Sequence, residues 1–93
     1  MKINKDFLLK EMVGANGDTT CYAIAVGKTA AKFKGMVKLN ETAEFIWKKI
    51  AEGLDEAEIL KEIVKTYDVT EETAAADLNK IIAELKSVSA IID

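Results

Sequence analysis

The side chains that usually carry out catalysis or bind metals are scarce in this chain of 93 residues. It contains no histidine, so the commonest general base and the commonest metal ligand are both missing. Its single cysteine, Cys21, excludes CxxC redox chemistry, a thiolate zinc site and an intrachain disulfide. No phosphate loop of the GxGxxG or GxxxxGK(S/T) type is present. We therefore predict a binding domain that is not an enzyme and that uses no cofactor or metal.

The charged side chains that remain are carboxylates and lysines, and they are divided unevenly along the chain. Residues 1–39 hold seven lysines and three acids, for a net charge of +4. Residues 40–93 hold six lysines and thirteen acids, for a net charge of −7. Two interpretations stay open: basic strands and acidic helices are both simply solvated, or the basic half meets an acidic partner.

Length and composition predict one domain that spans residues 1–93. Apolar residues make up 49% and charged residues 31% of the chain, which is typical of a globular protein and not of a disordered one. The first residues carry charge without a long apolar stretch behind them, and no apolar run is long enough to span a bilayer. We expect a cytoplasmic protein without a membrane partner.

The first 39 residues show the alternation of half-buried strands. We predict strands over Asp6–Val13 and Thr19–Val26, joined by the turn-forming segment Gly14–Asp18 into an antiparallel hairpin. A third strand is predicted over Lys32–Leu39, with lysines on one face that suit an exposed sheet edge. Alternation puts Phe33, Gly35, Val37 and Leu39 on one face of that strand, and Lys32, Lys34, Met36 and Lys38 on the other.

The rest of the chain has helical spacing. We predict helices over Glu41–Glu52, Glu56–Tyr67 and Glu71–Ser87. Each has a good N-cap residue directly before it: Asn40, Asp55 and Thr70.

Several side chains are assigned to the core. Phe45, Ile46 and Ile50 form the apolar stripe of the first helix. We place Trp47 in the core in preference to a groove margin, because a small domain needs its large aromatic residues inside. Cys21 is expected to be a small buried apolar residue, and the last four residues are expected to pack back onto the domain.

The short connection between the second and third helices predicts a helix-turn-helix. With the strands it predicts an α+β fold of the winged helix-turn-helix kind, so DNA binding is the first alternative function. The charges argue against it. The candidate recognition helix has four acids and two lysines, its first turn carries Glu71 and Glu72, and the chain has no arginine to contact guanine. We predict no nucleic-acid partner.

Several segments together resemble a known family. Leu39–Trp47, with the sequence LNETAEFIW, resembles the LNxTGxxIW segment of PqqD, the pyrroloquinoline quinone synthesis protein D. Tyr67–Thr73 and the positions Ala76–Leu78, Ile81, Ile82 and Leu85 resemble the later part of that family, and Phe7–Glu11 resembles its first strand. Ala43 stands where the family usually has glycine. The resemblance is therefore to the broader PqqD-like group, the recognition elements of ribosomally made, post-translationally modified peptides (RiPPs).

The resemblance implies a fold and a function. The fold is a three-stranded antiparallel sheet followed by three α-helices. The function is to bind the leader segment of a precursor peptide and to present the core segment to a modifying enzyme, often a radical S-adenosylmethionine (SAM) protein. The leader is implied to add as a strand beside the third strand, in a groove shared with the third helix. The implied peptide-binding residues are Lys32, Phe33, Lys34, Gly35, Met36, Val37, Lys38, Leu39, Ala74, Asp77, Leu78 and Ile81.

The residues at this place suit strand addition, which needs an exposed edge with unpaired backbone N–H and C=O groups. Gly35 either lets another backbone approach closely or marks a bulge. The three lysines would tune the affinity for acidic leader residues more than supply it, since an exposed ion pair contributes about 0–1 kcal/mol. On the third helix, Asp77 either accepts hydrogen bonds from the leader or braces a loop, while Leu78 and Ile81 also suit a purely core role.

A domain that scaffolds the modifying enzyme without binding the leader is the other function that stays open. Replacing Val37 with proline tests leader binding, because proline removes a strand N–H. A monomer or a weak dimer is expected, since the same sheet edge can pair with a second copy.

Overall fold

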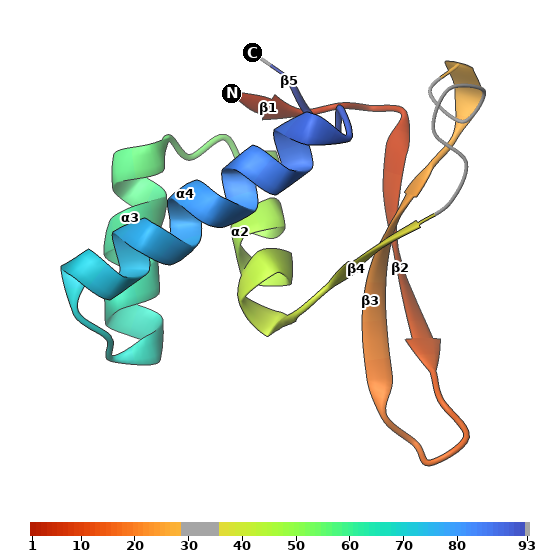
Figure 1. The fold of residues 1–93 in the computed structure, drawn as a ribbon, viewed down its shortest axis with the longest axis horizontal. Coiled ribbons are helices and arrows are strands. Elements are labelled where there is room, and N and C mark those ends of the chain that lie inside the picture. The colour runs from red at the N-terminus through yellow and green to blue at the C-terminus, as the bar shows by residue number, and fades with distance from the viewer. Residues whose placement is uncertain (29–35, 93) are drawn as a thin grey trace.

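A three-stranded antiparallel sheet is followed by three helices that gather on one side of it (Figure 1). The computed structural model describes residues 1–28 and 36–92. The strands β2 (Phe7–Val13), β3 (Thr19–Ala25) and β4 (Met36–Leu39) pair in the order β2-β3-β4. The three helices that follow the sheet are α2 (Glu41–Ala51), α3 (Glu56–Tyr67) and α4 (Glu71–Ser87). The predicted α+β fold is confirmed.

The hairpin forms where turn chemistry predicted it. Gly14 N–H donates to the Asp18 carbonyl at 2.7 Å, and Gly17 adopts a φ of +88°, which glycine tolerates best. The ladder is one residue shorter at its open end than predicted, but Val26 N–H still donates to the Asp6 carbonyl at 2.7 Å. Of the predicted third strand, the described part is β4; the positions 32–35 lie outside the described residues.

Local capping defines the helix starts, as the sequence predicted. Asn40 Oδ1 accepts from Ala43 N–H at 2.8 Å, and Thr70 Oγ1 accepts from Thr73 N–H at 3.2 Å. Asp55 and Glu58 form a reciprocal capping box, with backbone-to-carboxylate distances of 2.8 and 3.1 Å. The three helices begin at the predicted residues, and only the end of α2 differs, by one residue.

The two chain ends pair with each other, which the sequence analysis did not predict. Strand β1 (Lys2–Ile3) is antiparallel to β5 (Ile91–Ile92), and the N- and C-termini lie close together (Figure 1). Asn4 reinforces the pairing, because its backbone N–H donates to the Ala90 carbonyl and its Nδ2 to the Ser89 carbonyl, both at 2.8 Å. Residues 90–92 thus pack back on the domain as expected, through a second small sheet, and residue 93 lies outside the described residues.

The core fills the space between the inner face of the sheet and the helices. The strands contribute mainly small residues there, Cys21, Ala23 and Ala25, which let the large side chains of α2 approach closely. Trp47 is buried and meets Phe7 edge to face at 6.3 Å, so its core assignment and that of Cys21 are confirmed. Phe45 is only half-buried, since it lies at the margin of the core against Tyr67.

No helix within residues 1–28 and 36–92 combines the length and the apolar character needed to cross a membrane.

The stability of the domain should depend on the contact between α2 and the sheet. Ile46 is fully buried, so Ile46→Ala should lower the free energy of unfolding by about 2–5 kcal/mol. Val13 is 73% exposed, and Val13→Ala should change it by less than about 0.5 kcal/mol. Urea unfolding followed by tryptophan fluorescence measures both. Equal effects of the two substitutions would contradict the burial of Ile46 between α2 and the sheet.

Candidate functional site

Strand β4 has one edge that no other described strand pairs with. Its neighbour β3 lies on one side, in the register Cys21↔Leu39 and Ala23↔Val37. The bonds from Val26 to Asp6 and from Gly14 to Asp18 identify the hydrogen-bonded pairs of the hairpin. Because such pairs alternate along an antiparallel ladder, the backbone groups of the intervening residues, Cys21 and Ala23, point toward β4.

The same alternation decides which groups of β4 face outward. Val37 and Leu39 direct their N–H and C=O groups to β3, as partners of Ala23 and Cys21. Met36 and Lys38 direct theirs to the open edge. The N–H of Val37 is therefore part of the β3 ladder, and proline at this position would disturb the sheet itself. The proline substitution chosen from the sequence acts on the wrong edge.

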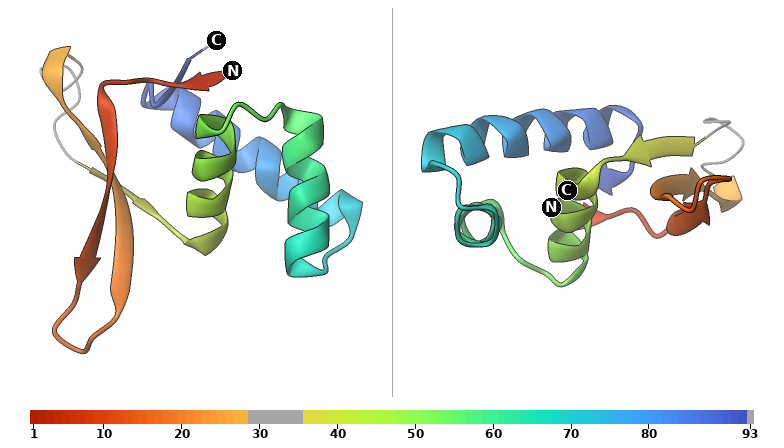
Figure 2. Two further views of the ribbon diagram at one scale, coloured as in Figure 1. Left: turned by 180° about the vertical axis from the view of Figure 1, so that it is seen from behind. Right: turned by 90° about the horizontal axis from the view of Figure 1, so that it is seen from below.

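A groove runs between the end of β4 and α4. One hollow of about 180 Å³ is lined by Val37, Lys38, Leu39, Asn40, Ala43, Ile81, Glu84 and Leu85. A second hollow of about 160 Å³ is lined by Asn40, Thr42, Asp77, Lys80, Ile81 and Glu84. The two share three residues and form one continuous surface, the β4–α4 groove. In the view from below in Figure 2, the C-terminal part of α4 lies close to the end of β4 that leads into α2.

The β4–α4 groove changes character along its length. Apolar side chains dominate the first hollow, where Ala43, Ile81 and Leu85 meet the inner side of β4. Polar and charged groups dominate the second, where Asp77 and Glu84 lie with Lys80. All three of these charged residues are exposed. An extended peptide in the groove would meet an apolar site followed by a polar one.

The structure brings together only some of the residues that the family resemblance implied. Val37, Lys38, Leu39, Asp77 and Ile81 line the β4–α4 groove, and Met36 belongs to its strand. Ala74 and Leu78 are buried in the core, at 0% and 3% exposure, and line neither hollow. Lys32, Phe33, Lys34 and Gly35 lie outside the described residues.

Several groove residues were not identified from the sequence. They are Asn40, Thr42, Ala43, Lys80, Glu84 and Leu85. Glu84 and Leu85 lie one helical turn beyond the residues implied by the resemblance. Their spacing from Ile81, three and four positions, puts them on the same side of α4, and this helical periodicity was the available clue.

Cys21 lines a different hollow, beside the carboxylates Glu11, Glu41 and Glu44. Burial raises the pKa of its thiol above the usual value, and the Glu44 carboxylate, which accepts a hydrogen bond from it, raises it further. The thiolate is the nucleophilic form, so this environment suppresses reactivity. No cluster in the described part of the chain gathers enough cysteine or carboxylate ligands to hold a metal ion.

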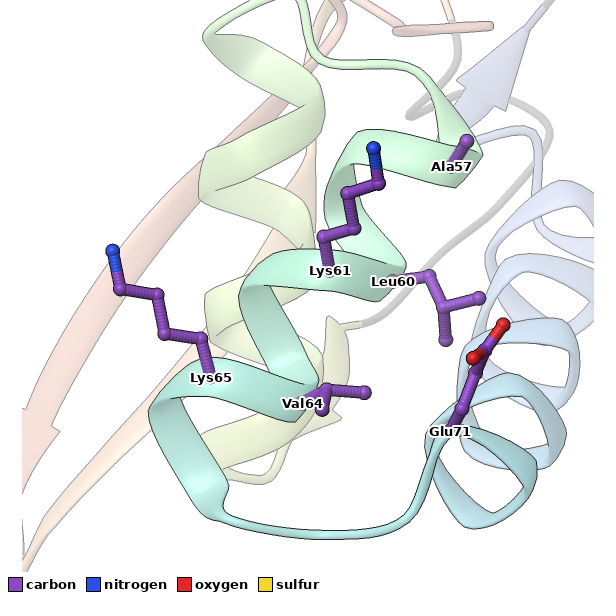
Figure 3. A pocket seen from close by; sticks show the side chains of 6 residues that line it. All are labelled: Ala57, Leu60, Lys61, Val64, Lys65 and Glu71. Atoms are coloured by element: carbon purple, nitrogen blue, oxygen red, sulfur yellow. The ribbon is translucent and has the colours of Figure 1, made fainter.

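Another hollow, of about 340 Å³, lies between α3 and α4 (Figure 3). Leu60 and Val64 point across it toward Glu71, while Lys61 and Lys65 point away. Its walls are helices, whose interior backbone N–H and C=O groups are already bonded to each other. It offers side-chain contacts only and cannot accept an added strand.

The β4–α4 groove lies within the part of the chain that matches a known family. Residues 20–91 match the family model of coenzyme PQQ synthesis protein D (PqqD). This chain belongs to the PqqD family. The matched segment runs from β3 to β5 and includes both walls of the groove.

A solved structure shares the fold of this PqqD-family chain. It is TbiB1 in complex with the TbiA(beta) leader peptide, with a TM-score of 0.77, 100% of both chains covered and 20% sequence identity. At this identity the likeness concerns the fold. A comparison with curated protein sequences finds no match.

The environment of Cys21 predicts slow thiol chemistry that depends on one carboxylate. Replacing Glu44 with glutamine removes the charge that raises the thiol pKa, so Glu44→Gln should speed alkylation by iodoacetamide severalfold at mildly alkaline pH. Glu41→Gln is the matched control, because Glu41 lines the same hollow but does not shift this pKa. Mass spectrometry measures the rates. Equal rates in both variants would contradict this assignment.

Proposed function

We propose that this chain binds the leader segment of a ribosomally made precursor peptide as an added strand on β4. The main observation in support is that the open edge of β4 faces a groove whose other wall is α4. Main-chain bonds at that edge would supply recognition with little sequence demand, and the side chains of the groove would supply specificity. The fold shared with TbiB1, which was solved with a leader peptide, supports the proposal.

The proposal assigns each wall of the site a part. Met36 and Lys38 would exchange backbone hydrogen bonds with the leader. Ile81, with its neighbour Leu85, would pack against an apolar leader side chain. Asp77 would lie beside the polar part of the leader. Among the described residues of β4, Lys38 is the lysine that could pair with an acidic residue of the leader.

The domain would act without a catalytic step of its own. It would present the core segment of the precursor to a modifying enzyme, which we propose to be a radical SAM protein. Burial and the Glu44 carboxylate raise the pKa of the chain's single thiol, Cys21, which disfavours its nucleophilic thiolate form. We propose a cytoplasmic monomer as the active form, with weak edge-to-edge dimerisation competing for the same strand.

Lys38→Pro tests strand addition directly, because it removes an N–H that faces the open edge and leaves the β3 ladder intact. The binding partner is the leader of the precursor encoded beside this gene, titrated by calorimetry. A lost hydrogen bond is worth about 1 kcal/mol, and the proline ring adds a clash, so affinity should fall by about tenfold or more. Amide signals of residues 36–40 and 77–85 should shift when the leader binds the wild-type chain.

Two matched variants separate the backbone from the side chain. Lys38→Ala keeps the N–H and should retain most of the affinity. Glu11→Pro places the same substitution on the far edge of the sheet, where the backbone of Glu11 faces away from β3. It should bind the leader like the wild-type chain. Equal losses in both proline variants, or a leader that shifts no β4 amide, would refute strand addition at β4.

A further inference from the structure

The side of the sheet that faces away from α2, α3 and α4 carries an apolar surface that none of these helices covers. Strand alternation places eight residues on it: Leu8, Lys10, Met12, Thr20, Tyr22, Ile24, Met36 and Lys38. We call this surface the outer sheet face. None of these residues is buried, whereas Phe7, Cys21, Ala23 and Leu39 on the inner face all are. Figures 1 and 2 show the three helices on the other side of the strands.

The register lines these residues up in rows across the three strands. Leu8 pairs with Ile24, and Ile24 pairs with Met36. Directly paired side chains lie about 5 Å apart, so the three form one continuous apolar strip. Leu8 is 57% and Met36 48% exposed, which makes them two of the four most exposed large apolar side chains among the described residues. Scattered apolar side chains are normal on a surface, but a contiguous strip indicates an interaction site.

The next row across the strands contributes positive charge to the outer sheet face. Tyr22 pairs with Lys10 on one side and with Lys38 on the other. Neither lysine forms an ion pair with a described residue, and none of the eight residues is acidic. Two copies that meet face to face would bring lysines together, which disfavours self-association. The fitting partner has an apolar centre flanked by carboxylates.

The outer sheet face is continuous with the proposed leader site, because Met36 and Lys38 belong to β4. A leader strand added to β4 would extend the sheet, and every second leader side chain would join the outer face. A protein that docks there would touch the domain and the leader at once. It would therefore bind the loaded domain more tightly than the empty one, and reciprocally strengthen leader binding.

We propose that the outer sheet face docks the peptide-modifying enzyme, through an apolar, carboxylate-flanked surface of that enzyme, and that the bound leader completes the docking surface. The inference rests on the proposed leader binding for its second part only. The apolar strip and the two lysines are present in the domain alone. The role of the face is to deliver the precursor to the enzyme that acts on it.

Substitutions on β2 test the docking face without touching the leader site, since β2 is the strand farthest from the open edge of β4. Leu8→Glu puts a carboxylate into the apolar strip, and Lys10→Glu reverses a charge beside it. Each should weaken binding of the purified modifying enzyme, encoded beside the precursor, by about tenfold or more. Calorimetry measures enzyme binding, with and without the leader, and a separate titration shows that leader affinity is unchanged.

Val13→Glu is the matched control. Val13 lies on the same strand and is 73% exposed, but its side chain belongs to the opposite face. This variant should bind the enzyme like the wild-type chain and tighten with leader to the same extent. Urea midpoints of all variants show whether each still folds.

The outcomes are distinguishable. The docking proposal is overturned if the wild-type domain does not bind the enzyme, or if Leu8→Glu and Lys10→Glu bind it as well as Val13→Glu does. It is also overturned if sedimentation shows a wild-type dimer that Leu8→Glu dissociates, because the face would then join two copies. A domain that binds the enzyme through Leu8 but binds no leader would support docking while refuting the proposed function.

Discussion

Asn40 is the only residue between β4 and α2, and the position of the groove depends on how it turns the chain. Its side chain accepts from Ala43 N–H at 2.8 Å, and its carbonyl accepts from Glu44 N–H at 2.9 Å. Because both bonds close the first turn of α2 directly after the strand, the helix must leave the sheet at a fixed angle and pack on its inner face. No described strand pairs with the outer edge of β4, and Asn40 itself lines both hollows of the groove.

The two faces of the sheet follow from one pattern of residue sizes. On β3, the small residues Cys21, Ala23 and Ala25 alternate with the larger Tyr22 and Ile24. The small set lets α2 approach the inner face, and the larger set stands on the outer face, which α2, α3 and α4 do not cover. A sheet that buried both faces would need a further layer of structure. The exposed strip is thus a direct consequence of packing α2, α3 and α4 on one face of a three-stranded sheet.

Much of the fold could be predicted because its determinants are local. Asn40, Asp55 and Thr70 defined the helix starts, and the segment Gly14–Asp18 defined the hairpin. The β1–β5 pairing could not be predicted, because its two-residue strands lie at opposite ends of the chain and are too short to show strand alternation. The resemblance implied Ala74 and Leu78 for the α4 wall of the groove, but both are buried in the core, and Glu84 and Leu85 line the groove one turn later. Tertiary packing, and not sequence spacing, decides which turn of α4 lies beside β4. Likewise, the direction of each β4 N–H depends on the hairpin register.

The free energy of adding a strand indicates which contacts would distinguish one peptide from another. Met36 and Lys38 offer one N–H and one C=O each, and a typical net hydrogen bond contributes about 0.5–1.5 kcal/mol. Fixing each peptide residue in an extended conformation costs about 1–2 kcal/mol of conformational entropy. This cost nearly cancels the free energy gained from the backbone hydrogen bonds. Apolar burial contributes about 25 cal/mol per Å² and must supply the surplus. In the proposed mode of binding, the hollow lined by Val37, Ala43, Ile81 and Leu85 would provide part of this burial, so its shape would help to determine which peptide binds.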